Sequence, residues 1–214
     1  MLDGPRLPPV SGGKPGSLGV LLHGFGSNGD DLIGLAEMIQ PALPNTAFVA
    51  PNAPSRMPQM AAAHQWWAID RFSAAESAAG ADAAAADLDA FLTDELSASG
   101  LAPDRLFLVG FSQGTMMALH VGLRRAAPVA GIIGLSGMLV APERLQAEIM
   151  SRPPVLLVHG TADDVVPFRS LDLASTALRA AGVDVETHVS NGIGHTVAID
   201  GLNAAAAFAK RVLG

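Results

Sequence analysis

A serine between two glycines stands where an apolar stretch gives way to a helix-forming stretch. The sequence G-F-S-Q-G occupies residues 110–114, after the apolar residues 106–109 and before the helical pattern of 115–123. A strand joined to a helix through G-x-S-x-G presents a serine hydroxyl on a sharp turn, and the glycines leave room for that turn. The helix directs its free N–H groups toward a developing oxyanion. The pattern therefore predicts Ser112 as a nucleophile for acyl transfer.

A serine nucleophile needs a base that takes its proton and a carboxylate that orients the base. Among six histidines, His195 lies in a glycine-containing loop between the last predicted strand and the last predicted helix, and we expect it to be the base. The carboxylate is Asp163 or Asp164, which are adjacent in the loop after an earlier strand, and their spacing does not separate them. Serine, aspartate and histidine then follow one another in the chain order of an α/β-hydrolase.

Two backbone N–H groups are expected to stabilise the oxyanion. One belongs to Gln113, and the other to Phe25 in the H-G-F-G segment that follows the first parallel strand. The same loop satisfies G-x-G-x-x-G over residues 24–29, the pattern of a dinucleotide site. That alternative lacks its acidic residue, because the next strand, residues 46–50, runs directly into proline and asparagine. A dinucleotide cofactor is therefore not expected.

A metal site is the other alternative for these polar loops. The candidate ligands are His159, Asp163, Asp164 and His195. They lack the close spacing of helical zinc motifs such as H-E-x-x-H, so neither a metal nor another cofactor is expected. The absence of cysteine excludes disulfides, thiolate metal sites and a cysteine nucleophile.

Composition and charge narrow the classes of partner. The chain has 214 residues, of which 50% are hydrophobic and 15% charged, which suits one folded domain over residues 1–214. A net charge of -7 argues against nucleic acid and anionic membrane surfaces as partners. The sequence shows neither a basic and apolar leader nor an apolar run of membrane-spanning length. We therefore expect a cytoplasmic protein without stable membrane insertion.

Strand and helix patterns alternate along the chain. Strands are predicted at residues 18–22, 46–50, 106–109, 129–135, 155–158 and 183–189, and helices at 30–39, 81–96, 115–123, 142–150, 168–181 and 200–213. Several strands are apolar on both faces, which is typical of an α/β fold with a mostly parallel central sheet and helices on both faces. The polar loops after residues 22, 109 and 158 then meet at one sheet edge. Residues 1–16 are predicted to form an extended N-terminal arm, with an edge strand near residues 7–10.

Residues 51–80 are predicted to be irregular. This segment contains the large apolar side chains of Met57, Met60, Trp66 and Trp67 among small and polar residues. Because the segment is expected to lie near the serine, we interpret these side chains as the apolar wall of an acyl pocket rather than as core.

These segments together resemble the phospholipase/carboxylesterase family of α/β-hydrolases, which includes acyl-protein thioesterases and small bacterial carboxylesterases. The resemblance rests on L-H-G-F-G at 22–26, P-N-A-P at 51–54, Q-W-W at 65–67, G-F-S-Q-G at 110–114, H-G-T-A-D-D-V-V-P at 159–167 and G-I-G-H at 192–195. It implies Ser112 as nucleophile, His195 as base and Asp163 rather than Asp164 as acid. It also implies Phe25 and Gln113 as the oxyanion donors.

The substrate pocket includes one further expected residue, and the sequence departs from the family at two places, Thr115 and residues 55–80. Val166, in the segment that contains the acid, joins Met57, Trp66 and Trp67 as an expected substrate-binding residue. Thr115 stands where the family usually has a second small residue, and it is expected to narrow the space beneath the serine. Residues 55–80, which shape the acyl pocket, differ from the family in sequence and length.

The expected activity is hydrolysis of carboxylic esters with short to medium acyl chains through an acyl-enzyme on Ser112. A lysophospholipase or an acyl-protein thioesterase would use the same residues, and either is an alternative. A non-catalytic binding protein of this fold is disfavoured, because binding alone does not require all five positions. The expected partner is a small-molecule ester or acyl substrate, and the sequence leaves a homodimer open.

Overall fold

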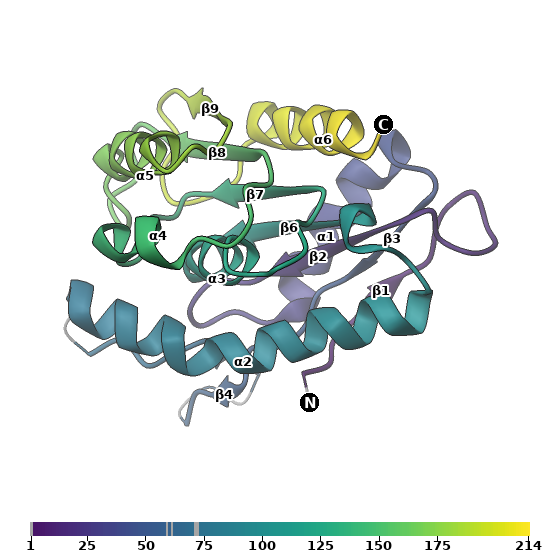
Figure 1. Cartoon of the computed structure of the whole chain (residues 1–214), viewed down its shortest axis with the longest axis horizontal. Coiled ribbons are helices and arrows are strands. Elements are labelled where there is room, and N and C mark those ends of the chain that lie inside the picture. The colour runs from purple at the N-terminus through teal and green to yellow at the C-terminus, as the bar shows by residue number, and fades with distance from the viewer. Residues whose placement is uncertain (1, 59, 61, 71–72) are drawn as a thin grey trace.

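A seven-stranded sheet lies at the centre of the structure (Figure 1). The computed structural model describes residues 2–58, 60, 62–70 and 73–214. The strand order is β1-β3-β2-β6-β7-β8-β9, in which β1 is antiparallel to β3 and every other neighbouring pair is parallel. The predicted α/β class with a mostly parallel sheet is confirmed.

Four central strands are almost completely buried, which explains why their sequences are apolar on both faces. The strands of the sheet are β1 (Arg6–Leu7), β2 (Ser17–Leu22), β3 (Thr46–Val49), β6 (Leu106–Phe111), β7 (Gly131–Leu135), β8 (Val155–Gly160) and β9 (Val185–Ser190). Every residue of β2, β7 and β8 is buried, and β6 is buried except at its last residue. A separate pair, β4 (Ser55–Arg56) and β5 (His64–Gln65), is antiparallel.

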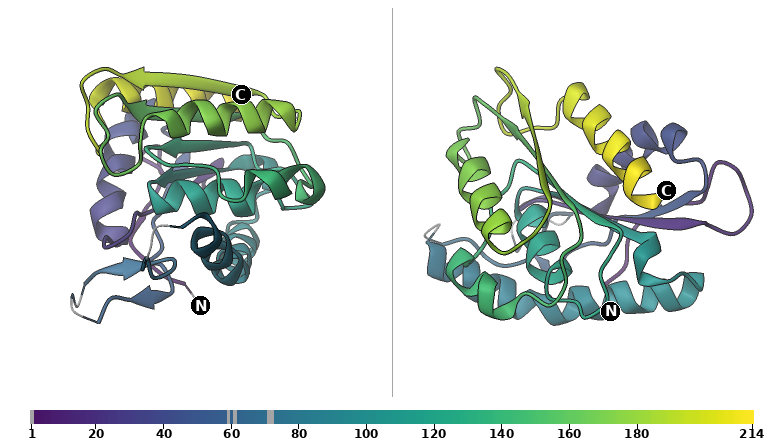
Figure 2. Two further views of the ribbon diagram at one scale, coloured as in Figure 1. Left: turned by 90° about the vertical axis from the view of Figure 1, so that its left-hand side faces the viewer. Right: turned by 45° about the horizontal axis from the view of Figure 1, so that its top comes forward.

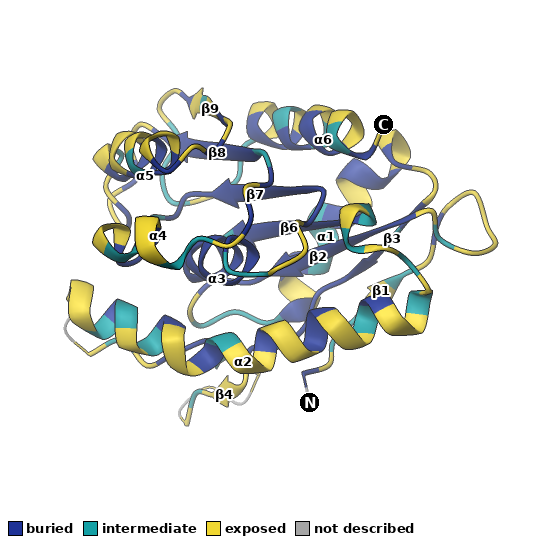
Figure 3. Ribbon diagram, viewed as in Figure 1, coloured by how far each residue is buried: buried dark blue, intermediate teal, exposed yellow. Residues whose placement is uncertain are grey.

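Helices cover both faces of the sheet, as predicted. They are α1 (Gly29–Ile39), α2 (Ala74–Ser99), α3 (Gln113–Gly122), α4 (Pro142–Glu148), α5 (Arg169–Ala180) and α6 (Ile199–Leu213), with 3-10 turns at Gln40–Ala42 and Pro103–Arg105. Residues of α1 and α6 share one apolar cluster with one side of the strands, and those of α2 to α5 share the other cluster. Figure 2 shows these two layers, and Figure 3 shows the buried strands between them.

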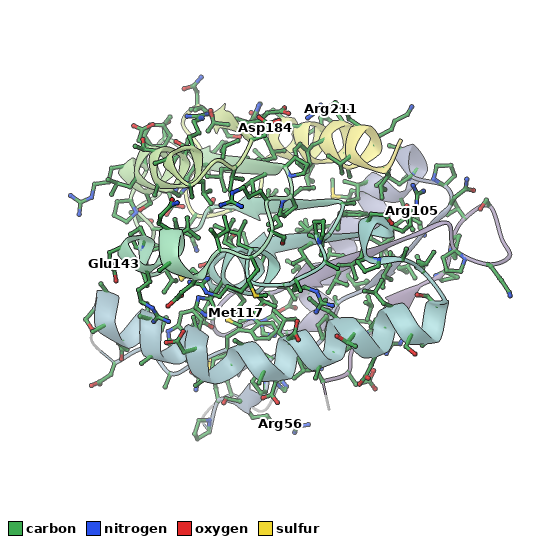
Figure 4. All side chains as sticks on the ribbon, in the orientation of Figure 1. Arg56, Arg105, Met117, Glu143, Asp184 and Arg211 are labelled. Atoms are coloured by element: carbon green, nitrogen blue, oxygen red, sulfur yellow. The ribbon has the colours of Figure 1, made fainter. Side chains whose placement is uncertain are left out.

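The core on the α3 side anchors the strand that leads to Ser112. Met117 of α3 is fully buried on the side of the sheet that α2 covers (Figure 4). At the other end of β6, Arg105 donates from Nε to the carbonyl oxygen of Gly16 and from Nη1 to that of Leu213. The start of β6 is therefore tied both to the segment before β2 and to the end of α6.

Helix α2 begins at Ala74, so the predictions of irregular structure over 51–80 and of a helix start at residue 81 are wrong over residues 74–80. Ser73 caps the helix by accepting a hydrogen bond from the N–H of Glu76 at 3.1 Å. Serine followed three residues later by glutamate is a capping signal, and it precedes the alanine-rich run directly. Residues 59, 61, 71 and 72 of the predicted irregular segment lie outside the described residues.

The N-terminal arm contributes a shorter edge strand than predicted. β1 spans only Arg6–Leu7, because Pro8 and Pro9 have no N–H group to donate to β3. Within the described residues, no helix is long and apolar enough to cross a membrane.

Candidate active site

Ser112 sits on a strained turn between β6 and α3. Its backbone has a φ of 54° and a ψ of -115°, a conformation that residues other than glycine rarely adopt. The flanking glycines have no room for a side chain. A Cβ atom on Gly110 would lie 2.3 Å from the carbonyl oxygen of Gly114, and one on Gly114 would lie 1.8 Å from that of Leu22. The fold therefore requires glycine at both positions of the motif.

We expect Gly114→Ala to lower the free energy of unfolding by about 3 kcal/mol or more, because its methyl group would overlap backbone atoms that cannot move aside. Gly34→Ala is the matched control, since the space around Gly34 in α1 is open and alanine favours a helix by about 1 kcal/mol. Denaturant unfolding of both variants measures the difference. Equal stability of the two variants would contradict the packing that the structure assigns to the turn.

Thr115 closes the space beneath the serine turn and links two strands. Its hydroxyl oxygen lies 2.7 Å from the carbonyl oxygen of Gly110, and it accepts a hydrogen bond from the N–H of Leu135 at 2.9 Å. Gly134 and Gly137 make room for it, because a Cβ on either glycine would come within 2.6 Å of the threonine side chain. The narrowing expected from Thr115 is present, and it is matched by these two glycines.

A chain of hydrogen bonds joins Asp163, His195 and Ser112. Asp163 Oδ2 lies 2.8 Å from His195 Nδ1, and His195 Nε2 lies 3.0 Å from Ser112 Oγ. Because a carboxylate oxygen only accepts, we assign the imidazole proton to Nδ1, which leaves Nε2 free to accept the serine proton. This is the arrangement that activates a serine hydroxyl for attack on an acyl carbon.

The neighbouring loop keeps the Asp163 carboxylate charged. Burial alone would raise the pKa of Asp163, but hydrogen bonds from His195 and from the N–H of Val166 outweigh it and hold the pKa below its usual value. A further hydrogen bond comes from the N–H of Val165 at 3.0 Å. Asp164 is exposed and points to no histidine, so the structure places Asp163 rather than Asp164 against the imidazole.

The loops that carry Asp163 and His195 are fastened to each other. The N–H of Ala162 donates to the carbonyl oxygen of Ile193 at 2.9 Å, and the N–H of Gly192 donates to the Thr161 hydroxyl at 2.8 Å. The ring of Phe111 packs against the imidazole of His195, with 5.0 Å between the ring centroids. The relative position of acid, base and nucleophile is therefore fixed by backbone contacts and packing.

The loop after β2 lies against the serine. A Cβ on Gly24 would come 3.2 Å from Ser112 Cβ, a tight contact, so a residue without a side chain favours this approach. The next N–H group, that of Phe25, and the N–H of Gln113 have no acceptor among the described residues. Both residues line the same cavity as Ser112. Two free donors beside the nucleophile are what an oxyanion hole requires.

His23 supports this loop from inside the protein. Its Nδ1 donates to the carbonyl oxygen of Gly24 at 2.8 Å, and its Nε2 accepts from the N–H of Ala53 at 2.9 Å. Burial lowers the pKa of His23, which favours the neutral ring that this pair of bonds needs. The histidine of the H-G-F-G segment therefore holds the loop in place and lies outside the wall of the cavity.

A cavity of about 470 Å³ opens beside Ser112 and His195. Its wall is mostly apolar and comes from the loop after β2, the segment before α2, and the first turns of α2, α3 and α5. Trp67 and Val166, both expected to bind substrate, belong to this wall. Pockets of this size and lining bind small organic molecules.

Trp66 and Met57, which the sequence assigned to the same wall, do not reach the cavity. Trp66 is 2% exposed, and its indole Nε1 donates to the carbonyl oxygen of His23. Its N–H donates to Gln113 Oε1, while Gln113 Nε2 donates to the carbonyl oxygen of Trp67. The Gln113 amide thus holds this segment so that one tryptophan enters the core and the next faces the cavity. Met60, the fourth residue of that prediction, is 55% exposed and also lies outside the wall.

Several residues of the cavity wall were not predicted from the sequence. They are Ile69, Ser77, Met116, Met138, Val165, Pro167, Arg169, Ser170 and Leu173. Met116 lies one turn after Gln113, and Arg169, Ser170 and Leu173 recur at helical spacing after the D-D-V-V-P segment, so helical periodicity was an available signal. Ser77 belongs to the part of α2 that was predicted to be irregular. Nothing in the sequence near Met138 marks it as a wall residue.

The polar loops do not form a metal site in the described part of the chain, where no group of three or more histidine, aspartate or glutamate side chains could hold an ion. His159 donates to the carbonyl oxygen of Val166 at 2.8 Å and thereby supports the Asp163 loop.

The fold and the site define a class of protein: an α/β-hydrolase, in which a parallel sheet presents a serine on a strained turn to a histidine from a later loop. The sequence matches the phospholipase/carboxylesterase family over residues 11–213, and the chain belongs to this family. It is therefore a hydrolase of the carboxylic ester type.

Individual relatives agree with this assignment. The chain is 30% identical to acyl-protein thioesterase 1 of Mycosarcoma maydis, over 96% of this chain and 95% of that protein. Among solved structures, it is 48% identical to esterase PE8, with 99% of each chain covered and a TM-score of 0.95. It is 26% identical to acyl-protein thioesterase 2 of Zea mays, with 98% of each chain covered and a TM-score of 0.77.

Proposed function

We propose that this chain is a serine carboxylesterase that hydrolyses esters with short to medium acyl chains. The observation that carries the proposal is the hydrogen-bonded series Asp163, His195 and Ser112 at the end of an apolar cavity. The 48% identity to a protein named an esterase supports the same activity.

The reaction proceeds through an acyl-enzyme. Ser112 Oγ attacks the acyl carbon while its proton passes to His195 Nε2, and Asp163 stabilises the imidazolium that forms. The intermediate collapses when His195 returns this proton to the departing alcohol. A water molecule then loses a proton to His195 Nε2 and attacks the acyl carbon, which releases the carboxylic acid and restores the Ser112 hydroxyl.

The developing negative charge falls on the former carbonyl oxygen of the substrate. The free N–H groups of Phe25 and Gln113 donate to that oxygen in both steps. Loss of one such donor typically raises the barrier by about 3–4 kcal/mol. Because both donors are backbone groups, one in the loop after β2 and one at the start of α3, they need no reorganisation when the charge forms.

A second candidate is an acyl-protein thioesterase or a lysophospholipase with the same catalytic residues. Relatives named acyl-protein thioesterase favour the former. The cavity favours smaller substrates, because about 470 Å³ lies in the lower half of the roughly 300–1,000 Å³ range of small-molecule pockets. The esterase with short to medium chains is therefore the first proposal.

Initial rates on 4-nitrophenyl esters of increasing acyl length test this choice. We expect kcat/KM for the butanoyl or octanoyl ester to exceed that for the hexadecanoyl ester by at least about tenfold, because a long chain outgrows the cavity. A palmitoyl thioester and a lysophospholipid are assayed in parallel. Highest kcat/KM on either of these would replace the first proposal with the second. No turnover of any substrate would favour a binding protein instead.

A further inference from the structure

Among the described residues that line the cavity, Arg169 is the only one with a permanently charged side chain. It is the first residue of α5 and is exposed where the cavity meets solvent. Within the described residues, its guanidinium makes no ion pair and no hydrogen bond. A cation that the protein itself leaves unpaired at the edge of an apolar pocket is available to a ligand.

The helix does not account for this arginine. A cation in the first turn of a helix is opposed by the positive end of the helix dipole, at a cost of about 0.3–1 kcal/mol. Asp172, in the same turn, is exposed and forms no ion pair with Arg169. A bound anion would be attracted both by the guanidinium and by the end of α5, which has no side-chain cap.

The rest of the wall is compatible with an anion. The described residues of the wall include no aspartate or glutamate, and besides Ser112 the hydroxyl groups of Ser77 and Ser170 lie among its apolar residues. The chain as a whole has a net charge of -7, which repels anions, so Arg169 supplies a local positive charge on a protein whose overall charge disfavours them.

We propose that Arg169 selects ester substrates that carry a negative charge remote from the scissile bond, such as the free carboxylate of a half-ester. Planar guanidinium and carboxylate groups form paired hydrogen bonds, and an apolar surround strengthens them. The inference rests on the proposed esterase activity, because it concerns the substrate of the same site. Neutral esters remain substrates, and Arg169 adds a preference for negatively charged esters over neutral ones.

The test compares two pairs of esters that differ in charge. On the acyl side, the mono-4-nitrophenyl ester of adipic acid is matched by 4-nitrophenyl hexanoate, which has the same number of acyl carbons. On the leaving-group side, 3-carboxyphenyl butanoate is matched by phenyl butanoate. For each pair, the ratio of kcat/KM for the charged ester to that for the neutral ester is measured. The ratio cancels changes that affect both members equally.

We expect Arg169→Gln to lower this ratio by about tenfold in one of the two pairs, and that pair identifies the side of the ester on which the anion lies. Arg169→Lys should retain part of the preference, and Arg169→Glu should lower the ratio further. The effect should shrink as salt is added, since Arg169 is exposed. Lys210→Gln on α6 is the matched control, because Lys210 is exposed, makes no ion pair in the described chain and lies outside this cavity.

Three results would overturn the inference. An unchanged ratio in both pairs would show that Arg169 does not contact the charge. An equal fall in the ratio for Lys210→Gln would show that net charge, rather than this residue, sets the preference. A higher ratio in Arg169→Glu than in the wild type would contradict the sign of the interaction. Failure of the proposed function is distinct, because the wild-type protein would then hydrolyse neither member of either pair.

Discussion

Replacement of Ser112 by alanine is expected to lower kcat/KM for 4-nitrophenyl butanoate by roughly a million-fold. The hydroxyl oxygen is the atom that bonds to the acyl carbon, and no other hydroxyl lies within hydrogen-bond distance of His195 Nε2 in the described chain. The residual rate comes from the oxyanion donors and from binding. Initial rates at saturating and limiting ester measure the loss.

Stability separates this loss from unfolding. Alanine keeps the Cβ that already occupies the strained backbone conformation, so we expect Ser112→Ala to unfold within about 0.5 kcal/mol of the wild-type protein. Ser97→Ala, on the exposed side of α2, is the control for activity. A phosphonate ester that reacts with activated serines should label the wild-type protein on Ser112 alone. Full ester hydrolysis by Ser112→Ala would refute the proposed mechanism.

The fold could be predicted because its central strands are buried on both faces and helices such as α5 and α6 are amphipathic. Each predicted strand and helix has a counterpart in the structure, and the boundaries differ by a few residues at most ends. The larger error, the start of α2, arose because the alanine-rich pattern has little amphipathic contrast, so the capping residues Ser73 and Glu76 were the only local signal. The edge strand, predicted near residues 7–10, lies instead at Arg6–Leu7, because Pro8 and Pro9 end its pairing with β3.

The meeting of the polar loops around Ser112 could be predicted, because parallel strands bring their carboxyl ends, and the loops that follow them, to one edge of the sheet. The spacing of Asp163 and Asp164 could not choose between them, whereas the turn in which Val165 and Val166 donate to Asp163 directs only that carboxylate inward. The cavity wall could be predicted only in part. Neighbouring residues such as Trp66 and Trp67 face opposite ways, and the Gln113 amide that decides this is distant in sequence.

Replacement of Asp163 by asparagine is expected to lower kcat for ester hydrolysis by about ten thousand-fold. In the wild-type protein, the carboxylate accepts the proton of His195 Nδ1 and leaves Nε2 without one. An asparagine NH₂ group in the same place would donate to Nδ1, which moves the imidazole proton to Nε2. His195 could then no longer accept the proton of Ser112, although the three side chains would keep their positions. The effect therefore acts on the tautomer rather than on the fold.

Asp164→Asn is the matched control for this substitution. It removes the same charge at the next residue, but Asp164 is exposed and has no contact with His195, so we expect its kcat to stay within about twofold of the wild-type value. In Asp163→Asn, the side-chain oxygen can still accept the N–H groups of Val165 and Val166, which preserves the loop. Nuclear magnetic resonance of the His195 ring protons would report the change of tautomer directly. Equal losses of activity in the two variants would mean that charge near the site, rather than orientation of the base, limits the reaction.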